Sequence, residues 1–330
     1  MDNYVPPFTI TNTTIELIAS IMKKIGQLEN YKDLNKMPIL RRNNRIRSIH
    51  SSLAIEANSL SLNQVKDIIN GKIVIGPLKE IQEVKNAYKA YEMIDKINPY
   101  SVNDLKKIHG IMTYLTVDES GDFRKGDEGV FDGNKCIFIA PKPDLVDSLM
   151  KELFNWLKKN ENKIHPLILS SVLHYEFVFI HPFSDGNGRM ARLWQNVILS
   201  KWEKIFAYVP IETEIKEYQE EYYKSIQTSN LSGDSTKFIE FMLKMINEVL
   251  EKLIESTQKT ANYTSTYVKK LLEVMDDNIP MTSIELMKTL RLKSRKSFRQ
   301  NYLKPAIENG LIKMTEPNNP TSRNQRYYKI

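Results

Sequence analysis

The chain has 330 residues, of which 41% are hydrophobic and 26% are charged, a composition typical of a globular protein. No apolar run approaches the roughly 18 residues that a membrane span needs, and MDNYVPPFTI lacks the basic-then-apolar order of a secretory signal. The one cysteine, Cys136, has no partner, which excludes an intramolecular disulfide and fits a reducing compartment. We therefore expect a cytoplasmic protein without membrane contact, built as two domains or as one large domain with an appendage.

Helical periodicity dominates the first part of the chain. In residues 11–29 the apolar side chains Leu17, Ile18, Ile21, Ile25 and Leu28 recur along one stripe. Further helices are predicted, in chain order, over residues 37–57, 62–71, 78–97, 101–115, 144–160, 165–180, 190–203 and 215–256.

A glycine-rich segment interrupts the helices. Residues 119–141 hold four of the 12 glycines. The β-prone sequence CIFIA lies between the turn dipeptide Asp132-Gly133 and Pro141. The pattern predicts a β-hairpin over about residues 129–141.

The last seventy residues differ in composition. The polar stretch 256–265 (STQKTANYTS) lacks a core pattern and is the predicted linker. After it, helices are predicted over residues 266–276, 282–290 and 294–309, the last interrupted by Pro305, followed by two short strands around a Pro/Asn-rich turn. This order indicates a winged-helix domain over residues 266–330. The predicted fold class is mainly α, with a helical core, a hairpin and this small domain.

The net charge of +7 belongs to the same end of the chain. Residues 261–330 hold 13 Lys and Arg against 6 Asp and Glu, whereas residues 1–260 hold 34 of each. Four cations, Lys293, Arg295, Lys296 and Arg299, fall at the start of the expected recognition helix. The balance is compatible with nucleic-acid contact and also with a basic surface that only aids solubility.

Residues 181–192, HPFSDGNGRMAR, gather groups suited to phosphate chemistry. Gly186-Asn187-Gly188 can turn several backbone N–H groups into one concavity, and a helix that begins there adds partial positive charge. Arg189 and Arg192 share one helix face and can clamp phosphate. Taken singly, a glycine turn and two solvated arginines are ordinary structural features.

Two further groups of this segment suit a transfer reaction. Asp185 could hold Mg²⁺ together with phosphate oxygens. His181 could serve as a general base near neutral pH, although a histidine before proline is more often structural. The combination predicts attack of a hydroxyl on a metal-held polyphosphate.

The segment matches at every position the pattern His-Pro-Phe-x-[Asp/Glu]-Gly-Asn-Gly-Arg-x-x-Arg and so resembles the Fic family. LHYEFVFI before the motif, YYKSIQTSN after it, and the stretches GDFR and IFIAPKP also resemble Fic segments. The C-terminal region resembles winged helices attached to Fic domains. The resemblance implies that residues 1–255 comprise an N-terminal helical region and the catalytic domain.

The resemblance implies AMP transfer from ATP to a Ser, Thr or Tyr hydroxyl of a protein target, the chain itself included. By this analogy His181 is the base, Asp185 holds Mg²⁺, and the phosphate-binding residues are Gly186, Asn187, Gly188, Arg189 and Arg192. Related Doc kinases usually have lysine at the position of Arg189, which favours AMP transfer over phosphate transfer.

The resemblance also assigns positions outside the motif. The hairpin residues Lys135, Cys136, Ile137 and Phe138 form a flap that pairs with an extended target segment. Tyr222, Tyr223 and Asn230 match positions that border the nucleotide; from the residues alone, tyrosines packing a helix are an equal alternative.

SSLAIEAN (51–58) resembles the inhibitory Fic motif Ser/Thr-x-x-x-Glu-Gly/Asn, carried here by a helix over about residues 38–58. A glutamate at position 56 that pairs with Arg192 would occupy the place of the γ-phosphate, and Ser52 lies one turn before it. The family pattern has Gly or Asn where this chain has Ala57. The same Glu56 could instead position water for removal of AMP.

A DNA-binding regulator that carries a Fic domain is the competing class of function. The winged helix could also bind protein or pack on its own core, and the chain could form a homodimer. His174, on the helix before the motif, is expected in the core. His50, His109 and His165 show no metal-ligand spacing, and no Cys/His cluster suggests zinc.

Overall fold

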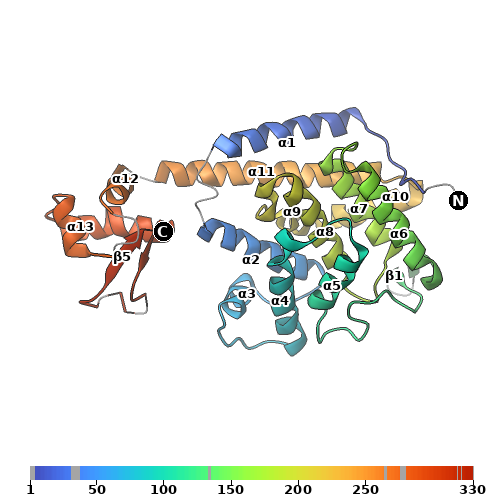
Figure 1. The fold of residues 1–330 in the computed structure, drawn as a ribbon, viewed down its shortest axis with the longest axis horizontal. Coiled ribbons are helices and arrows are strands. Elements are labelled where there is room, and N and C mark those ends of the chain that lie inside the picture. The colour runs from blue at the N-terminus through green and yellow to red at the C-terminus, as the bar shows by residue number, and fades with distance from the viewer. Residues whose placement is uncertain are drawn as a thin grey trace. The chain divides into compact units, whose positions relative to one another are not determined.

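The computed structural model describes residues 4–30, 38–132, 135–263, 266–275, 280–317, 319–320 and 322–329. In these residues the protein is mainly helical, with two small antiparallel sheets (Figure 1), which confirms the predicted fold class. No helix in the described residues is long and apolar enough to cross a membrane.

The chain divides into two compact units. The first comprises Met1–Ile25 and Asn43–Leu250, and the second comprises Gly26–Arg42 and Glu251–Ile330. The unit boundaries fall inside three helices, α1 (Asn12–Asn30), α2 (Pro38–Ile55) and α11 (Thr236–Tyr263). The polar stretch predicted as a linker is therefore helical up to Tyr263. It contains no Gly or Pro that would end the helix, so the lack of an apolar stripe does not stop it.

Two helices form the centre of the first unit. Nearly every side chain of α7 (Pro166–Ile180) is buried, as expected for a helix that is apolar all round. α8 (Asn187–Trp202) packs beside it and buries Trp194 completely. The first half of the HPFSDGNGRMAR motif, residues 181–186, is the loop that joins these two helices, and its second half begins α8, so the core of the unit fixes both ends of the motif.

Further elements surround these helices in the first unit. They are α3 (Leu62–Ile69), α4 (Leu78–Tyr91), η2 (Ile94–Lys96), α5 (Val102–Met112), α6 (Pro143–Asn160), η3 (Lys204–Ala207), α9 (Ile211–Glu217) and α10 (Gln219–Ser232). The predicted continuous helix over 215–256 is wrong, because the chain breaks at Tyr218 and at Gly233. Gly233 has a φ of +63°, a left-handed backbone that ends a helix. The predicted helix over 78–97 likewise stops at Tyr91 and continues as η2.

The predicted hairpin is present. β1 (Gly129–Asp132) pairs antiparallel with β2 (Lys135–Ile139), and the register shifts between Val130 and Phe131. The predicted turn at 133–134 lies outside the described residues. Within the described chain this sheet has only these two strands.

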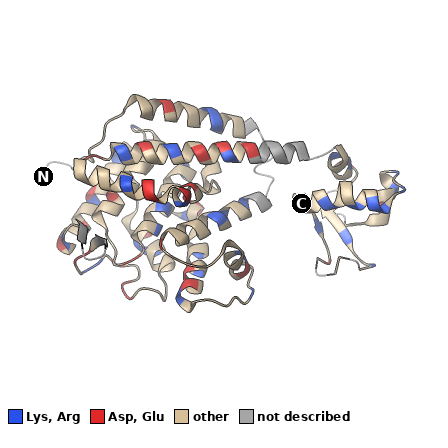
Figure 2. Cartoon of the chain, turned by 180° about the vertical axis from the view of Figure 1, so that it is seen from behind, with Lys and Arg blue, Asp and Glu red and all other residues tan. Residues whose placement is uncertain are grey.

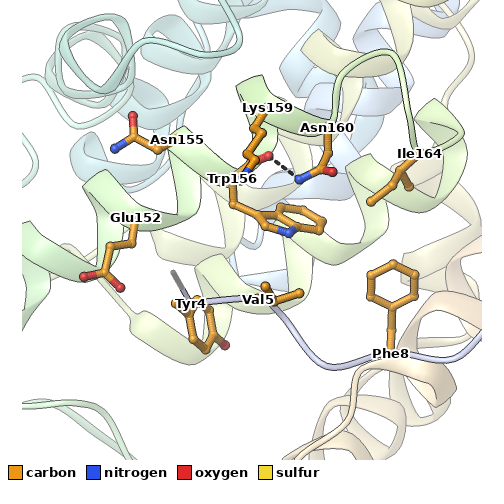
Figure 3. Close-up of a pocket in the computed structure, with 9 residues that line it drawn as sticks. All are labelled: Tyr4, Val5, Phe8, Glu152, Asn155, Trp156, Lys159, Asn160 and Ile164. Carbon is orange, nitrogen blue, oxygen red and sulfur yellow. Dashed lines mark hydrogen bonds between the residues drawn. The ribbon is translucent and has the colours of Figure 1, made fainter. Parts of the chain in front are cut away.

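The N-terminal segment crosses several helices of the first unit. Tyr4 donates a hydrogen bond of 2.8 Å to the Glu176 carboxylate on α7, and Pro7 accepts one from the Ser235 N–H at 2.9 Å. A cavity of about 330 Å³ lies between this segment and α6, with Phe8 and Trp156 in its wall (Figure 3). No motif residue lines this cavity, so it is separate from the candidate site.

The second unit contains the predicted helices and strands. The helical elements are α12 (Thr266–Glu273), α13 (Ser283–Thr289), α14 (Arg295–Ser297), the π-helix η4 (Phe298–Leu303) and α15 (Lys304–Glu308). The sheet has the order β3 (Met281–Thr282), β5 (Arg326–Lys329), β4 (Ile312–Met314). Strand β3 was not predicted, because two residues carry no alternation pattern.

Pro305 does not interrupt the helical path of the second unit. Proline lacks an N–H and clashes with the carbonyl four residues earlier, so an α-turn cannot contain it. Here the preceding turn widens into η4, and Pro305 falls in the first turn of α15, where it is tolerated.

Candidate active site

The motif loop is closed by its own asparagine. The Asn187 side chain accepts a hydrogen bond from the Phe183 N–H at 2.9 Å and donates one to the Phe183 carbonyl at 2.7 Å. Gly186 has a φ of +85°, and a Cβ there would lie 3.2 Å from the Thr113 methyl group. The Asn187 side chain therefore shapes the loop before α8.

His181 ends α7 in a left-handed conformation with a φ of +52°. Its Nδ1 lies 3.3 Å from the Val178 carbonyl oxygen, which can only accept a hydrogen bond. Nδ1 therefore carries the proton, and the lone pair is on Nε2. Burial lowers the pKa of His181, which keeps the ring neutral near pH 7. His181 can therefore accept a proton.

Arg124, which the sequence analysis did not assign, fixes the backbone on both sides of His181. Its Nε donates to the His181 carbonyl at 2.7 Å, and its backbone N–H donates to the Pro182 carbonyl at 2.9 Å. The guanidinium also donates to the carbonyl of Pro141, just after β2. The GDFR stretch thus ties the motif loop to the base of the hairpin.

His109, also unassigned from sequence, supports the loop from α5. The Gly121 N–H donates to its Nδ1 at 2.9 Å, so the proton is on Nε2, which donates to the Asp185 carbonyl at 3.0 Å. Its ring stacks on Phe183 with centroids 3.6 Å apart. Burial lowers the pKa of His109 to about 4, so the ring stays neutral. It is a structural support of the loop.

Arg189 is buried and lies between two carboxylates. Its Nη2 lies 2.8 Å from Asp185 Oδ1 and its Nη1 lies 3.4 Å from Glu83 Oε1. Glu83, on α4, was not predicted. The Asp185 side chain is 44% exposed.

The groups around Asp185 can be tested for a fit to Mg²⁺. Among the described residues, no group of three or more His, Cys, Asp or Glu side chains could hold a metal alone. Mg²⁺ is commonly held by one or two carboxylates together with substrate phosphates and water. A single accessible carboxylate beside a phosphate site fits a metal that arrives with a nucleotide.

Arg192 is fully buried and is bound by residues of α2 and the turn after it. Its Nη2 lies 2.8 Å from Glu56 Oε1, and it also donates to the Ser52 carbonyl at 2.9 Å. Its Nε donates to Ser52 Oγ at 3.1 Å. Burial is the largest single effect on Arg192 and would lower its pKa, but the combined effects of Glu56, Tyr222 and Tyr91 outweigh burial and the pKa is raised. The expected contact of Glu56 with Arg192 is therefore present in the structure, and Ser52 also binds Arg192, a contact that the sequence did not predict.

The Glu56 carboxylate also lies against the start of α8. A Cβ built on Gly188 would collide with Glu56 Oε1 and would lie 3.1 Å from Arg192 Nη1. The absence of a side chain at this glycine thus makes room for an anionic group. The partial positive charge of a helix N-terminus and the Arg192 guanidinium both favour such a group here.

The three positions of α10 have different surroundings. Tyr222 is buried and its hydroxyl lies 3.0 Å from Nε2 of the core residue His174. Tyr223 is 48% exposed, and its hydroxyl donates to the Ile55 carbonyl at 3.4 Å, next to Glu56. Asn230 accepts a hydrogen bond from Tyr175 at 3.0 Å. Tyr222 is thus buried beside His174 and Arg192, whereas Tyr223 lies beside the turn that carries Glu56.

The flap lies next to the end of α7. Its backbone pairs Cys136 with Phe131 and Lys135 with Asp132. The side chains of Lys135, Cys136 and Ile137 lie outside the described residues. The Phe138 ring packs on Phe179, two residues before His181, with centroids 5.3 Å apart. One strand edge of the hairpin is thus held close to the predicted base.

Comparison with known proteins identifies the family. The chain superposes with a TM-score of 0.75 on the crystal structure of a Fic family protein from Desulfovibrio desulfuricans G20, with 41% identity over 99% of this chain and 98% of that one. The chain belongs to the Fic family. The Fic/DOC family model matches residues 99–199, and the model of the Fic-like C-terminal domain matches residues 266–329. The family predicted from the motif is confirmed.

The Fic protein also resembles curated relatives named protein adenylyltransferase Fic. The relative from Aedes aegypti is 26% identical over 72% of this chain and 46% of the relative, and that from Nematostella vectensis is 28% identical over 63% and 48%. The chain spans about half the length of these relatives. Fic-1 from Caenorhabditis elegans, at 24% identity and a TM-score of 0.62 over 74% of this chain, shares the fold.

Proposed function

We propose that this Fic protein transfers AMP from ATP to a hydroxyl group of a protein target, itself included, and is restrained by Glu56. The observation that carries the proposal is the neutral His181 beside a helix start with two buried arginines. The relatives named adenylyltransferases support the same activity.

The proposed reaction is an in-line displacement at the α-phosphorus. His181 Nε2 takes the proton of the target hydroxyl while its oxygen attacks, a phosphorus–oxygen ester bond forms, and the bond to pyrophosphate breaks. The backbone of Gly186, Asn187 and Gly188 binds phosphate oxygens, and Arg189 and Arg192 balance their charge. Asp185 is the residue that would hold Mg²⁺, and a bound Mg²⁺ would neutralise negative charge on the phosphate oxygens.

The hairpin supplies the proposed target site. An extended segment of the target would add to its free edge by backbone hydrogen bonds. Because Phe138 packs on Phe179, such a segment would pass close to His181. The reaction would therefore depend on hydroxyl side chains in extended, accessible segments.

Glu56 is the proposed brake. Its carboxylate binds Arg192 and lies over Gly188, where the γ-phosphate would make the same interactions. Two anions cannot share this space, so ATP binds productively only when Glu56 leaves.

Mass spectrometry tests the proposed reaction. The Glu56→Gly variant is incubated with MgATP and lysate, and modified peptides are sought. We expect AMP on hydroxyl side chains, weak modification by the parent protein and none by Glu56→Gly/His181→Ala. AMP addition that survives His181→Ala would contradict the role of His181.

The reverse direction is the alternative at the same site. Glu56 is 38% exposed and could hold water that attacks an AMP-modified protein. Loss of AMP from a modified target with the parent protein, but not with Glu56→Gly, would favour this direction.

DNA binding is a second candidate function, located in the second unit. Arg291, Lys293, Arg295, Lys296 and Arg299 are all exposed, and none forms an ion pair with another described residue. Figure 2 shows basic residues gathered on the helices of this unit. Such cations before and along a recognition helix suit phosphate contacts of a duplex.

A gel shift of the full chain with duplex DNA at low and high salt tests this candidate. We expect binding that weakens steeply with salt and is lost in R295E/K296E/R299E. The exposed lysines of α6 give a matched control, K151E/K158E/K159E. No binding at low salt would remove the candidate.

A further inference from the structure

The turn after α2 is held by an asparagine whose side-chain nitrogen and oxygen both form hydrogen bonds. Asn58, two residues after Glu56, is 8% exposed. Its Nδ2 donates to Glu83 Oε2 at 2.9 Å and to the Glu80 carbonyl at 3.3 Å, while its Oδ1 accepts from the Leu60 N–H at 3.2 Å. The position of the Glu56 backbone is therefore fixed by contacts with α4.

The Glu83 carboxylate serves two different parts of the site. One oxygen accepts the Asn58 hydrogen bond, and the other lies 3.4 Å from Arg189 Nη1. The side chain is 12% exposed, so solvent screens these interactions little. Glu83 is thus the described residue that contacts both the turn behind Glu56 and the arginine expected to bind phosphate.

Arg189 needs this second carboxylate. It is 4% exposed, and its Nε has no hydrogen-bond partner among the described residues. Its other charged partner is Asp185, which is also the candidate metal ligand. If Asp185 held a metal, Glu83 would be the carboxylate left to hold the guanidinium, and a buried cation without a partner is strongly disfavoured.

We propose that Glu83 is a positioning residue that couples the two halves of the site. One oxygen holds Arg189 in place for the phosphates of ATP, and the other holds the turn that presents Glu56 to Arg192. The inference deepens the proposed function and rests on it. It predicts that mutations can separate the two contacts of Glu83. The contact with Arg189 acts on ATP binding, and the contact with Asn58 acts on the restraint by Glu56.

Binding of MgATP measured by titration calorimetry tests the first contact without requiring turnover. In the Glu56→Gly background, Glu83→Gln keeps an acceptor for Asn58 but removes the charge beside Arg189. We expect its Kd to rise about tenfold, the loss of one charge-assisted contact. Glu80→Gln is the matched control, because Glu80 lies on the same helix and binds Ser59 of the same turn without contacting Arg189. Its Kd should change less than about twofold.

Asn58→Ala tests the second contact. With Glu56 present, it should strengthen MgATP binding about fivefold, because the turn that holds the brake loosens. In the Glu56→Gly background it should leave the Kd unchanged. If Glu83→Gln does not unfold cooperatively, Glu83→Asp keeps the charge and should give an intermediate Kd.

Two results would overturn the inference. One is an equal Kd for the Glu83→Gln and Glu80→Gln variants, and the other is an equal effect of Asn58→Ala with and without Glu56. A Glu56→Gly protein that binds MgATP but transfers no AMP would contradict the proposed function alone, and the Kd values would still decide the role of Glu83.

Discussion

Glu56 accepts a hydrogen bond of 2.8 Å from Arg192, a residue 136 positions further along the chain. Arg192 is fully buried, and the Glu56 carboxylate compensates much of its positive charge. The pair joins the turn after α2 to α8, so Glu56 can be changed without altering a helix. In this structure the buried Arg192 is therefore already paired with an internal anion.

Ser52→Ala should release part of this restraint. Arg192 loses the Ser52 hydroxyl acceptor but keeps the Ser52 carbonyl and Glu56. One hydrogen bond to a charged group contributes about 1.5 kcal/mol, so we expect AMP transfer to rise roughly tenfold, less than for Glu56→Gly. Initial rates with labelled ATP measure the effect. Ser51→Ala is the control, since that hydroxyl binds Thr213 instead; equal rates in the two variants would contradict the assignment.

His109→Phe should weaken nucleotide binding through the loop. The variant retains a ring to stack on Phe183 and loses the hydrogen bonds to Gly121 and Asp185. Two neutral hydrogen bonds are worth about 2 kcal/mol. In the Glu56→Gly background we expect a MgATP Kd raised more than about tenfold. An unchanged Kd in a folded variant would show that the loop holds its shape without this histidine.

Glu176→Gln should stabilise the protein only at neutral and alkaline pH. Burial raises the pKa of Glu176 to about 7, although the Tyr4 hydrogen bond opposes the shift. The folded state therefore favours the protonated acid. The stability that protonated Glu176 contributes is fully present below pH 4.5 and is lost as the pH rises through 7. At pH 8 the variant should be more stable by up to about 3 kcal/mol, from 1.36 kcal/mol per pKa unit. Urea denaturation at pH 5 and pH 8 measures this; a difference independent of pH would contradict it.

The pH profile of the Glu56→Gly variant should report His181. Burial lowers the pKa of this ring below its usual 6.5, and only the neutral ring accepts a proton. The kcat/KM for AMP transfer should therefore be constant through neutral pH and fall only on the acid side of 6.5. A midpoint above 6.5 for this acid limb would be inconsistent with a buried, neutral base.

A contact between two family motifs could be predicted from the sequence, whereas supporting contacts could not. The family pattern predicted that Glu56 meets Arg192, and the structure places the two in contact. Arg124, His109 and Glu83 lie 57 to 106 residues from the motif groups that they bind, and no spacing rule links such positions. Their roles follow from burial and hydrogen-bond geometry, which exist only after the helices have packed.

Helix existence was predicted better than helix ends. The break at Gly233 could have been predicted from its glycine, yet the apolar period on both sides suggested one helix. The extension of α11 to Tyr263 lacked an apolar signal, and the π-helix before Pro305 depends on the backbone widening around one residue. In each case tertiary packing or backbone geometry overrides the local pattern.

The most direct measurement of the central claim compares label transfer from ATP labelled at the α- or the γ-phosphorus. The parent protein, Glu56→Gly and Glu56→Gly/His181→Ala are each incubated with Mg²⁺ and either substrate. We predict protein-bound label from α-labelled ATP only, weak for the parent, strong for Glu56→Gly and absent without His181. Label from γ-labelled ATP, or equal labelling by the parent and Glu56→Gly, would contradict an AMP transferase restrained by Glu56.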